Sequence, residues 1–144
     1  MAFNAYQVGV LTDGTNIAGA DYSSATAQYR LVRLTTEHTI KYTTVVTQVP
    51  YGVLMNRPSS GESAAVAVGG VVPIRITTTA HSAIAVGSKI GISTAAAGSG
   101  GLSTALTRYV IGRSKSVLAA NTTGIITVHL TFEGSGSTGA GTAP

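Results

Sequence analysis

Nearly a third of this chain is β-branched, and that feature limits its possible folds more than any other. Of its 144 residues, 21 are Thr, 15 are Val and 10 are Ile. These side chains lose rotamer freedom in helices and pack well on a pleated sheet. The sequence therefore predicts an all-β protein, and it argues against long helices, coiled coils and disorder across the middle of the chain.

Short β-rich segments alternate with turn signals between residues 28 and 133, which we take as one β domain. The only helical candidate, residues 24–29, directly precedes them. Pro73 indicates that its own strand lies at a sheet edge or contains a bulge. Eight or nine short strands at this spacing favour an antiparallel sandwich or a small barrel. The expected strands are 28–35, 43–49, 51–56, 64–68, 71–78, 88–94, 108–114 and 124–132, with turns at 59–61, 98–101 and 121–124.

The two ends of the chain differ from this domain. Residues 1–27 are interpreted as an extended N-terminal arm with one short strand, Tyr6–Leu11, which ends at the Asp13-Gly14 turn signal. Their charge is −2, whereas residues 28–133 carry +6. We therefore expect the arm to reach a neighbouring subunit or a basic patch on a partner; the alternative is an edge strand in its own sheet. Residues 134–144 have the composition of a flexible tail.

A weak internal repeat occurs at an offset of sixty residues. Gly52 precedes Val66 by fourteen residues, and Gly112 precedes Ile126 by the same distance. In both places a strand interrupted by glycine leads through a turn to an alternating apolar strand. Two such hairpins could pair across a pseudo-twofold axis, although common residues can also align by chance.

Charge and cysteine content exclude several classes. Charged residues make up 10% of the chain, and the net charge is +4. Lys and Arg occur singly rather than in the clusters that mark a nucleic-acid surface, so no nucleic-acid partner is expected. No segment is long and apolar enough to span a membrane, and no secretory signal is present. Cys is absent, which removes disulfides and thiolate metal sites.

The sequence contains few side chains in patterns that indicate catalysis or metal binding. Three histidines, at positions 38, 81 and 129, lack the spacing of a metal site, and His129 is expected to face solvent or an interface. No nucleophile motif surrounds a serine. Glu62 and Glu133 are the best candidates for a catalytic pair of carboxylates. Glu62 is expected in a turn and Glu133 at the end of a strand, and carboxylates in such places are more often solvated. We therefore expect no enzyme activity, no metal and no cofactor.

Candidate interface residues occur in two places. Arg30 and Arg33 fall on opposite faces of one expected strand, and Arg57 precedes a proline at a strand end. Arginine is enriched at interface hot spots, but such charges can also keep an edge strand soluble. From the arm we add the apolar or aromatic residues Phe3, Tyr6 and Val8.

The ordered series of elements from residue 49 to 132 resembles the small capsid decoration, or cement, proteins of tailed bacteriophages. A Pro-x-Gly-Val element is followed by a Gly-Glu turn, a Val-rich strand, a Gly-containing strand start and an apolar-Gly-Arg segment. The unusual N-terminal zone, the Thr-rich segment 43–49 and the glycine-rich tail depart from the family pattern. The matching positions are Pro50, Gly52, Val53, Gly61, Glu62, Val66, Gly70, Ile84, Gly87, Ile90, Gly112, Arg113, Gly124 and Val128.

The resemblance implies a non-catalytic virion protein that is made in the host cytoplasm and binds the outer surface of an expanded capsid. Its partners would be the major capsid protein and other copies of itself, most often in a trimer. One alternative is a carbohydrate-binding or fibre-type β-sandwich module of a phage, although the chain has no Trp. Another is a small β-barrel enzyme or ligand carrier, which would need an interior pocket.

Overall fold

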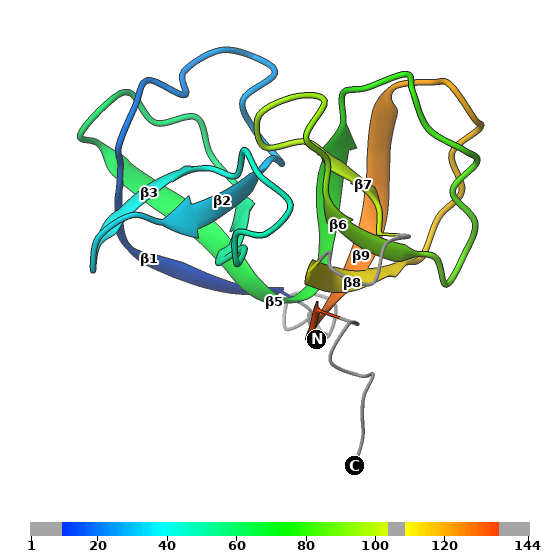
Figure 1. Cartoon of the computed structure of the whole chain (residues 1–144). Helices are drawn as coiled ribbons and strands as arrows, with labels where there is room; N and C mark the ends of the chain where they lie inside the picture. Colours follow the sequence, from blue (N-terminus) through cyan, green and yellow to red (C-terminus); the bar gives the residue numbers. More distant parts are fainter. Residues whose placement is uncertain (1–9, 104–108, 136–144) are drawn as a thin grey trace, which may run out of the picture.

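Strand β5 (Ser63–Ile76) organises the fold, because its two ends belong to two different halves of the molecule (Figure 1). The computed structural model describes residues 10–103 and 109–135. Within these ranges there is no helix, which confirms the predicted all-β class. The strands other than β5 are β1 (Val10–Ala18), β2 (Leu31–Leu34), β3 (Thr39–Tyr42), β4 (Gly52–Leu54), β6 (Lys89–Ile92), β7 (Gly100–Leu102), β8 (Tyr109–Ser114) and β9 (Gly124–Ser135). The nine strands form one mixed sheet, in which β1 and β3 are parallel and not antiparallel as expected.

The first half is a small closed barrel. The N-terminal part of β5 pairs with β4 on one side and with β1 on the other, both antiparallel. β4 pairs with β2, and β2 with β3. β3 then pairs with β1 in parallel, Ile17 opposite Thr39, which closes the ring. Closure leaves fewer strand edges open to unwanted pairing.

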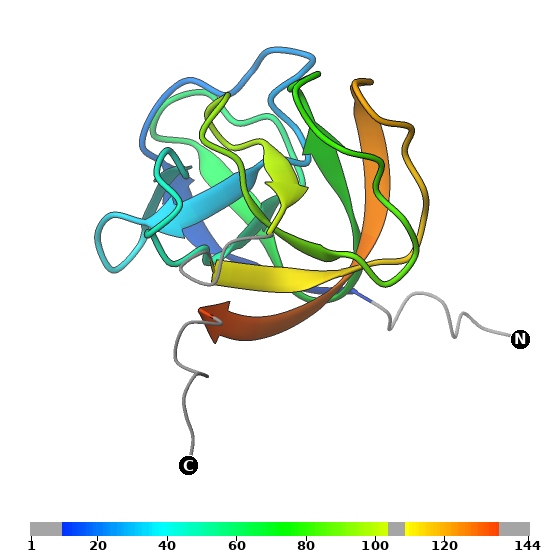
Figure 2. The ribbon, with the colours of Figure 1, turned by 45° about the vertical axis from the view of Figure 1, so that its right-hand side comes forward.

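The second half repeats this arrangement. The C-terminal part of β5 pairs with β9, then β9 with β8, β8 with β6, and β6 with β7, all antiparallel. Figure 2 shows β9 running beside β5 and then beside β8. The chain near β7 returns to β5, where the Thr77 amide donates to Ser99 Oγ over 3.0 Å.

The strand register identifies the two halves as a tandem structural repeat. Val10 of β1 lies opposite Gly70 of β5, and sixty residues further along Gly70 itself lies opposite Leu130 of β9. Val32 pairs with Gly52, and Ile90 pairs with Gly112; the glycines are sixty residues apart, and a register shift after Ile90 makes the other offset 58. The C-terminal part of β5 thus occupies in the second half the place that β1 occupies in the first, and the offset noticed in the sequence is structural.

Both repeat glycines are required by close approach of the next strand. A Cβ on Gly52 would lie 2.2 Å from the Ala67 carbonyl oxygen and 2.6 Å from Val66 Cγ1. A Cβ on Gly112 would lie 2.2 Å from the His129 oxygen and 2.7 Å from Val128 Cγ1. No side chain fits at such distances, so each glycine lets its hairpin close.

Two apolar cores fill the molecule, and several strands contribute to both. On β2, Leu31 faces the larger core and Val32 the smaller one. On β4, Val53 and Leu54 divide in the same way. Successive side chains of a strand point to opposite faces, so these strands are buried on both sides. At Leu31 and Val32, both faces of β2 are therefore internal.

Four other local expectations differ from the structure. The strands expected at 64–68 and 71–78 are one strand, β5, which bends at Gly70 (φ +89°) without ending there and stops at Ile76. β3 and β7 were not expected, and the turn predicted at 98–101 overlaps β7. Residues 24–29 form turns without a helix. Segment 43–49 is a loop, because the Gln48 side chain accepts the amides of Thr44 (2.7 Å) and Val45 (3.2 Å) and holds a turn.

Pro73 fits within β5 because of the direction its nitrogen faces. The Arg75 amide donates to Tyr29 O (2.8 Å), on the side of β5 away from β9. Alternate residues of a strand point their amides the same way, so the Pro73 nitrogen also faces away from β9. The β5–β9 ladder therefore loses no donor at Pro73, as expected for a proline on the unpaired side of a strand.

The N-terminal zone belongs partly to the sheet. The strand expected at Tyr6–Leu11 is β1, which begins at Val10 and runs to Ala18 through a bulge at Asp13. Ala18, Tyr22 and Ala27 pack in the smaller core. For residues 10–18, the alternative of a strand in its own sheet describes the structure. At the other end, β9 extends two residues into the expected tail; residues 1–9 and 136–144 lie outside the described ranges.

Candidate interaction surface

Of the six predicted interface residues, the structure describes three; Phe3, Tyr6 and Val8 lie outside the described ranges. Arg57 is exposed and precedes the buried Pro58. It is separated in the chain from the other two arginines by more than twenty residues. No hydrogen bond or ion pair among the described residues links Arg57 to Arg30 or Arg33.

Arg30 lies just before β2 and is held by backbone oxygens. Its Nε donates to Thr26 O (2.8 Å) and its Nη1 to Ala97 O (2.7 Å). Its guanidinium also lies over the Tyr42 ring, 5.5 Å from the centroid, which is a cation–π distance. Arg30 is thus a half-buried, fixed cation rather than a free surface charge.

Arg33 lies within β2, opposite Lys41 of β3. It is half-buried, and its Nε is a buried donor that has no hydrogen-bond partner among the described residues. Its charge lowers the pKa of Tyr22, although burial of the ring outweighs it and raises that pKa overall. The side chain is therefore part of the interior of the first half.

The described aromatic side chains form internal contacts. Tyr22 and Tyr42 stack with centroids 4.1 Å apart, and the Tyr42 hydroxyl donates to Ala27 O (3.0 Å). Burial raises the pKa of Tyr42 to about 12. Every described Tyr and Phe is buried or half-buried. An exposed aromatic platform, which a carbohydrate-binding module would use, is therefore absent from the part of the chain that the structure describes.

Asp13, which we read as a turn signal, instead stabilises a bulge in β1. Its carboxylate accepts a hydrogen bond from the Tyr51 hydroxyl, and others from the Thr15 amide (2.9 Å) and the Asn16 side chain (3.1 Å). The Tyr51 hydrogen bond is the main cause of a strongly lowered Asp13 pKa. The carboxylate thus ties β1 to the residue that precedes β4.

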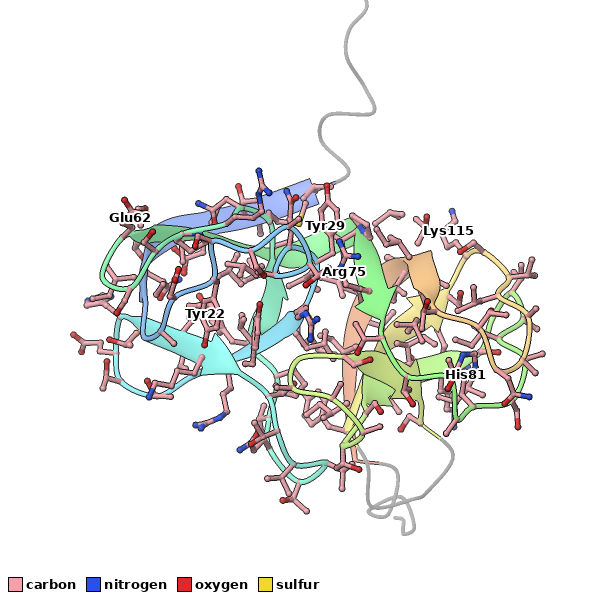
Figure 3. The ribbon with its side chains drawn as sticks, turned by 90° about the horizontal axis from the view of Figure 1, so that it is seen from above. Tyr22, Tyr29, Glu62, Arg75, His81 and Lys115 are labelled. Carbon is pink, nitrogen blue, oxygen red and sulfur yellow. The ribbon has the colours of Figure 1, made fainter. Side chains whose placement is uncertain are left out.

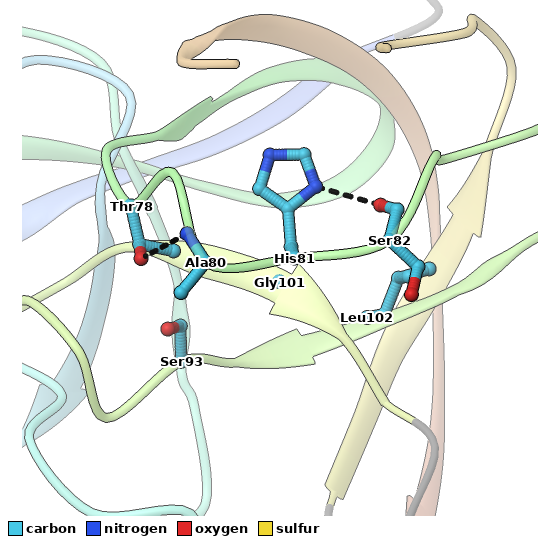
Figure 4. A pocket seen from close by; sticks show the side chains of 7 residues that line it. All are labelled: Thr78, Ala80, His81, Ser82, Ser93, Gly101 and Leu102. Carbon is cyan, nitrogen blue, oxygen red and sulfur yellow. Dashed lines mark hydrogen bonds between the residues drawn. The ribbon is translucent and has the colours of Figure 1, made fainter. Parts of the chain in front are cut away.

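The second half contains a pocket of about 170 Å³ whose lining includes His81, Ser82 and Ser93. Figure 4 shows these side chains from close by. Nδ1 of His81 lies 2.7 Å from Ser82 O, and Nε2 lies 2.6 Å from Thr122 O. Because each ring nitrogen faces a backbone oxygen at hydrogen-bond distance, neither nitrogen is placed to take a proton from a serine hydroxyl. The histidine instead links the segment after β5 to the turn before β9.

Three other titratable groups named from the sequence are exposed or paired: His129, Glu133 and Glu62. His129 is exposed, as predicted, while Ile126, Val128 and Leu130 are buried. Glu133 accepts two hydrogen bonds from Arg113, at 2.8 and 2.9 Å, and this pairing lowers its pKa to about 2. A carboxylate held ionised cannot act as a general acid. Glu62 is exposed and accepts the Ser59 amide at 2.7 Å.

Two features are absent from residues 10–103 and 109–135. No group of three or more metal-binding side chains occurs within these ranges. They also contain no helix with the length and apolarity needed to cross a bilayer.

Exposed apolar side chains are the remaining surface feature. Val45 and Val49 are 46% and 63% exposed on the loop before β4. Val86 and Val117 are 68% and 70% exposed in the second half, on segments joined by the Ile84–Leu118 bridge. Exposed aliphatic side chains of this kind suit contact with another protein.

The fold is similar to a solved phage protein. The chain superposes on the head fiber gp8.5 N base of bacteriophage phi29 with a TM-score of 0.54 and 14% sequence identity. The match covers 85% of this chain and 94% of that chain. Neither a known protein family nor a curated protein matches the sequence. At this level of identity the likeness establishes the fold.

Proposed function

We propose that this protein is a structural component of a phage virion that binds the outer surface of the capsid and stabilises it. The observation that carries the proposal is the likeness in fold to a phage head fiber base over 85% of the chain. The resemblance of residues 49–132 to capsid decoration proteins points the same way. Its partners would be the major capsid protein and other copies of itself in a trimer, with no catalytic step and no cofactor.

Two features of the molecule are compatible with this role. Both ring nitrogens of His81 face backbone oxygens and Glu133 is paired with Arg113, so neither of these two side chains is arranged as a catalytic base or acid. Exposed valines in both halves offer apolar contact to a protein surface. A trimer would also multiply each weak contact, because later binding events become intramolecular.

The test uses purified capsids that lack this protein. Recombinant full-length protein should sediment with expanded shells and saturate a fixed number of sites, and it should raise the temperature at which the shells rupture. Light scattering of the free protein should give three times the mass of one chain. Failure to sediment with shells at tens of micromolar would contradict the proposal, whereas a monomer that still binds would contradict only preformed trimerisation.

A second candidate function follows from the name of the structural neighbour: a base that attaches a fibre to the head. The two functions differ in what projects from the capsid. Electron cryomicroscopy of decorated virions should show compact knobs for a decoration protein and an elongated projection for a fibre base. Binding to a glycan array would instead favour a carbohydrate-binding module.

A further inference from the structure

The junction of the two halves contains a surface pocket of about 300 Å³ that both halves line. Figure 3 shows Arg75, near the end of β5, at this junction. Because β5 is shared, the repeat itself creates the pocket. The lining residues are Thr26, Arg30, Arg75, Ile76, Thr77, Thr123 and Gly124.

Backbone oxygens hold both arginines of the pocket in place. Arg30 donates to Thr26 O (2.8 Å) and Ala97 O (2.7 Å), and Arg75 Nε donates to Gln28 O (3.1 Å). These acceptors are uncharged, so they orient the guanidinium groups without neutralising them. Nη2 of Arg30 and both Nη atoms of Arg75 hydrogen-bond to no described residue.

No carboxylate within the described ranges pairs with either arginine. Ion pairs there involve only Glu37, with His38, and Glu133, with Arg113. Asp13 is engaged by Tyr51. Two partly buried like charges that line one pocket repel each other, and an anion bound between them would relieve that repulsion.

The same lining contains an unsatisfied hydroxyl. Thr77 Oγ1 is buried and has no hydrogen-bond partner among the described residues. A buried polar atom without a partner costs roughly 1–3 kcal/mol and calls for an explanation. A bound group with acceptor oxygens would supply the missing partner after a rotation of the Thr77 side chain.

From these observations we propose that the pocket binds a carboxylate, presented by an acidic side chain of the protein that this chain docks on. Guanidinium groups bind carboxylates through paired, parallel hydrogen bonds. The molecule already uses this geometry between Arg113 and Glu133. The identity of the partner as the capsid protein rests on the proposed function, whereas carboxylate binding itself does not.

The first experiment titrates the full chain with sodium acetate, and separately with inorganic phosphate, at constant ionic strength. The readout is the side-chain Nε–Hε resonances of Arg30 and Arg75. Acetate should shift both resonances saturably, and Arg75→Gln should weaken binding at least fivefold. Arg75→Lys, which keeps the charge without the fork, should bind more weakly than the wild type.

The matched control is Lys115→Gln, which removes an exposed charge that does not line the pocket. It should titrate like the wild type, and amide spectra should show that all variants are folded. Equal acetate binding by wild type and Arg75→Gln would overturn the proposal. Binding of phosphate without acetate would overturn it as well, because the ligand would then not be a carboxylate.

The second experiment separates the pocket from the proposed function. Folded Arg30→Gln and Arg75→Gln proteins should occupy capsid shells at least tenfold less than wild type at matched concentration, with Lys115→Gln unchanged. If the variants bind shells as well as the wild type, the docking inference is wrong even where acetate binds. If the wild type does not bind shells, the proposed function fails, while the acetate titration still decides carboxylate binding.

Discussion

The two halves of the molecule share a strand order but fill it with different side chains. In the first half, tyrosines and alanines occupy much of the core, with Tyr22 and Tyr42 stacked inside it. In the second half, the core is dominated by isoleucines such as Ile90, Ile111 and Ile126. The shared features are the register and the two glycines at positions 52 and 112. The two halves therefore agree in strand pairing and in the close approach of strands at the glycines, and they differ in the identity of their core residues.

The largest expected effect tests whether the two glycines are equivalent. Gly52→Ala and Gly112→Ala should each destabilise the protein by about 4 kcal/mol, because the new Cβ meets a carbonyl oxygen of the adjacent strand. Gly14→Ala is the matched control, since a Cβ there meets nothing within 4 Å. Chemical denaturation measures all three. A severe loss at one site and little at the other would contradict the equivalence of the halves.

The next effect tests whether the halves unfold together. Ile90 and Val32 hold corresponding places opposite the two glycines and are fully buried. Ile90→Ala should cost about 3 kcal/mol and Val32→Ala about 2 kcal/mol, according to the volume removed. Because β5 and the larger core join the halves, each variant should shift a single calorimetric transition. Two separate transitions would show that the halves are independent folding units.

At alkaline pH, the protein should lose stability through a tyrosine of the first half. Burial raises the pKa of Tyr42 to about 12, above its usual value near 10, so the folded state retains this proton more strongly than the unfolded state. Its contribution to stability is therefore complete below pH 10 and lost as pH rises from 10 to 12. Tyr42→Phe should show a shallower decline in unfolding free energy over this range. An identical decline in the variant would exclude Tyr42 as the cause.

At acidic pH, the protein should lose stability through an ion pair of the second half, and this is the smallest of the four expected effects. Arg113 lowers the pKa of Glu133 from 4.5 to about 2, so the pair stabilises the folded state above pH 4.5 and its contribution is lost as pH falls toward 2. The pair is partly exposed, so the effect should be at most about 1 kcal/mol. Glu133→Gln should flatten the acid limb of the stability profile, and a limb of unchanged slope would argue against the pair.

The candidate site shows the limit of sequence reasoning more clearly than the fold. Arg30 was named as an interface residue, but Arg75 and Thr77 were not, because nothing near them in the sequence differs from an ordinary strand end. They line a pocket with Arg30 only because β5 continues past Gly70 into the second half. A signal was present in the sixty-residue repeat, which indicated two similar hairpins but not the single strand that joins the two halves.

Sequence patterns alone determined those features that depend on residues close together in the chain. The β-branched content determined the all-β class, the alternation in β9 determined which of its side chains are buried, and the glycine spacing marked the repeat. Tertiary structure decided what depends on distant partners. Segment 43–49 is as β-branched as a strand, yet it forms a loop, whereas the glycine-rich β7 is a strand because β6 supplies its hydrogen bonds. A strand exists only where another backbone lies alongside it, and that neighbour can be far away in the sequence.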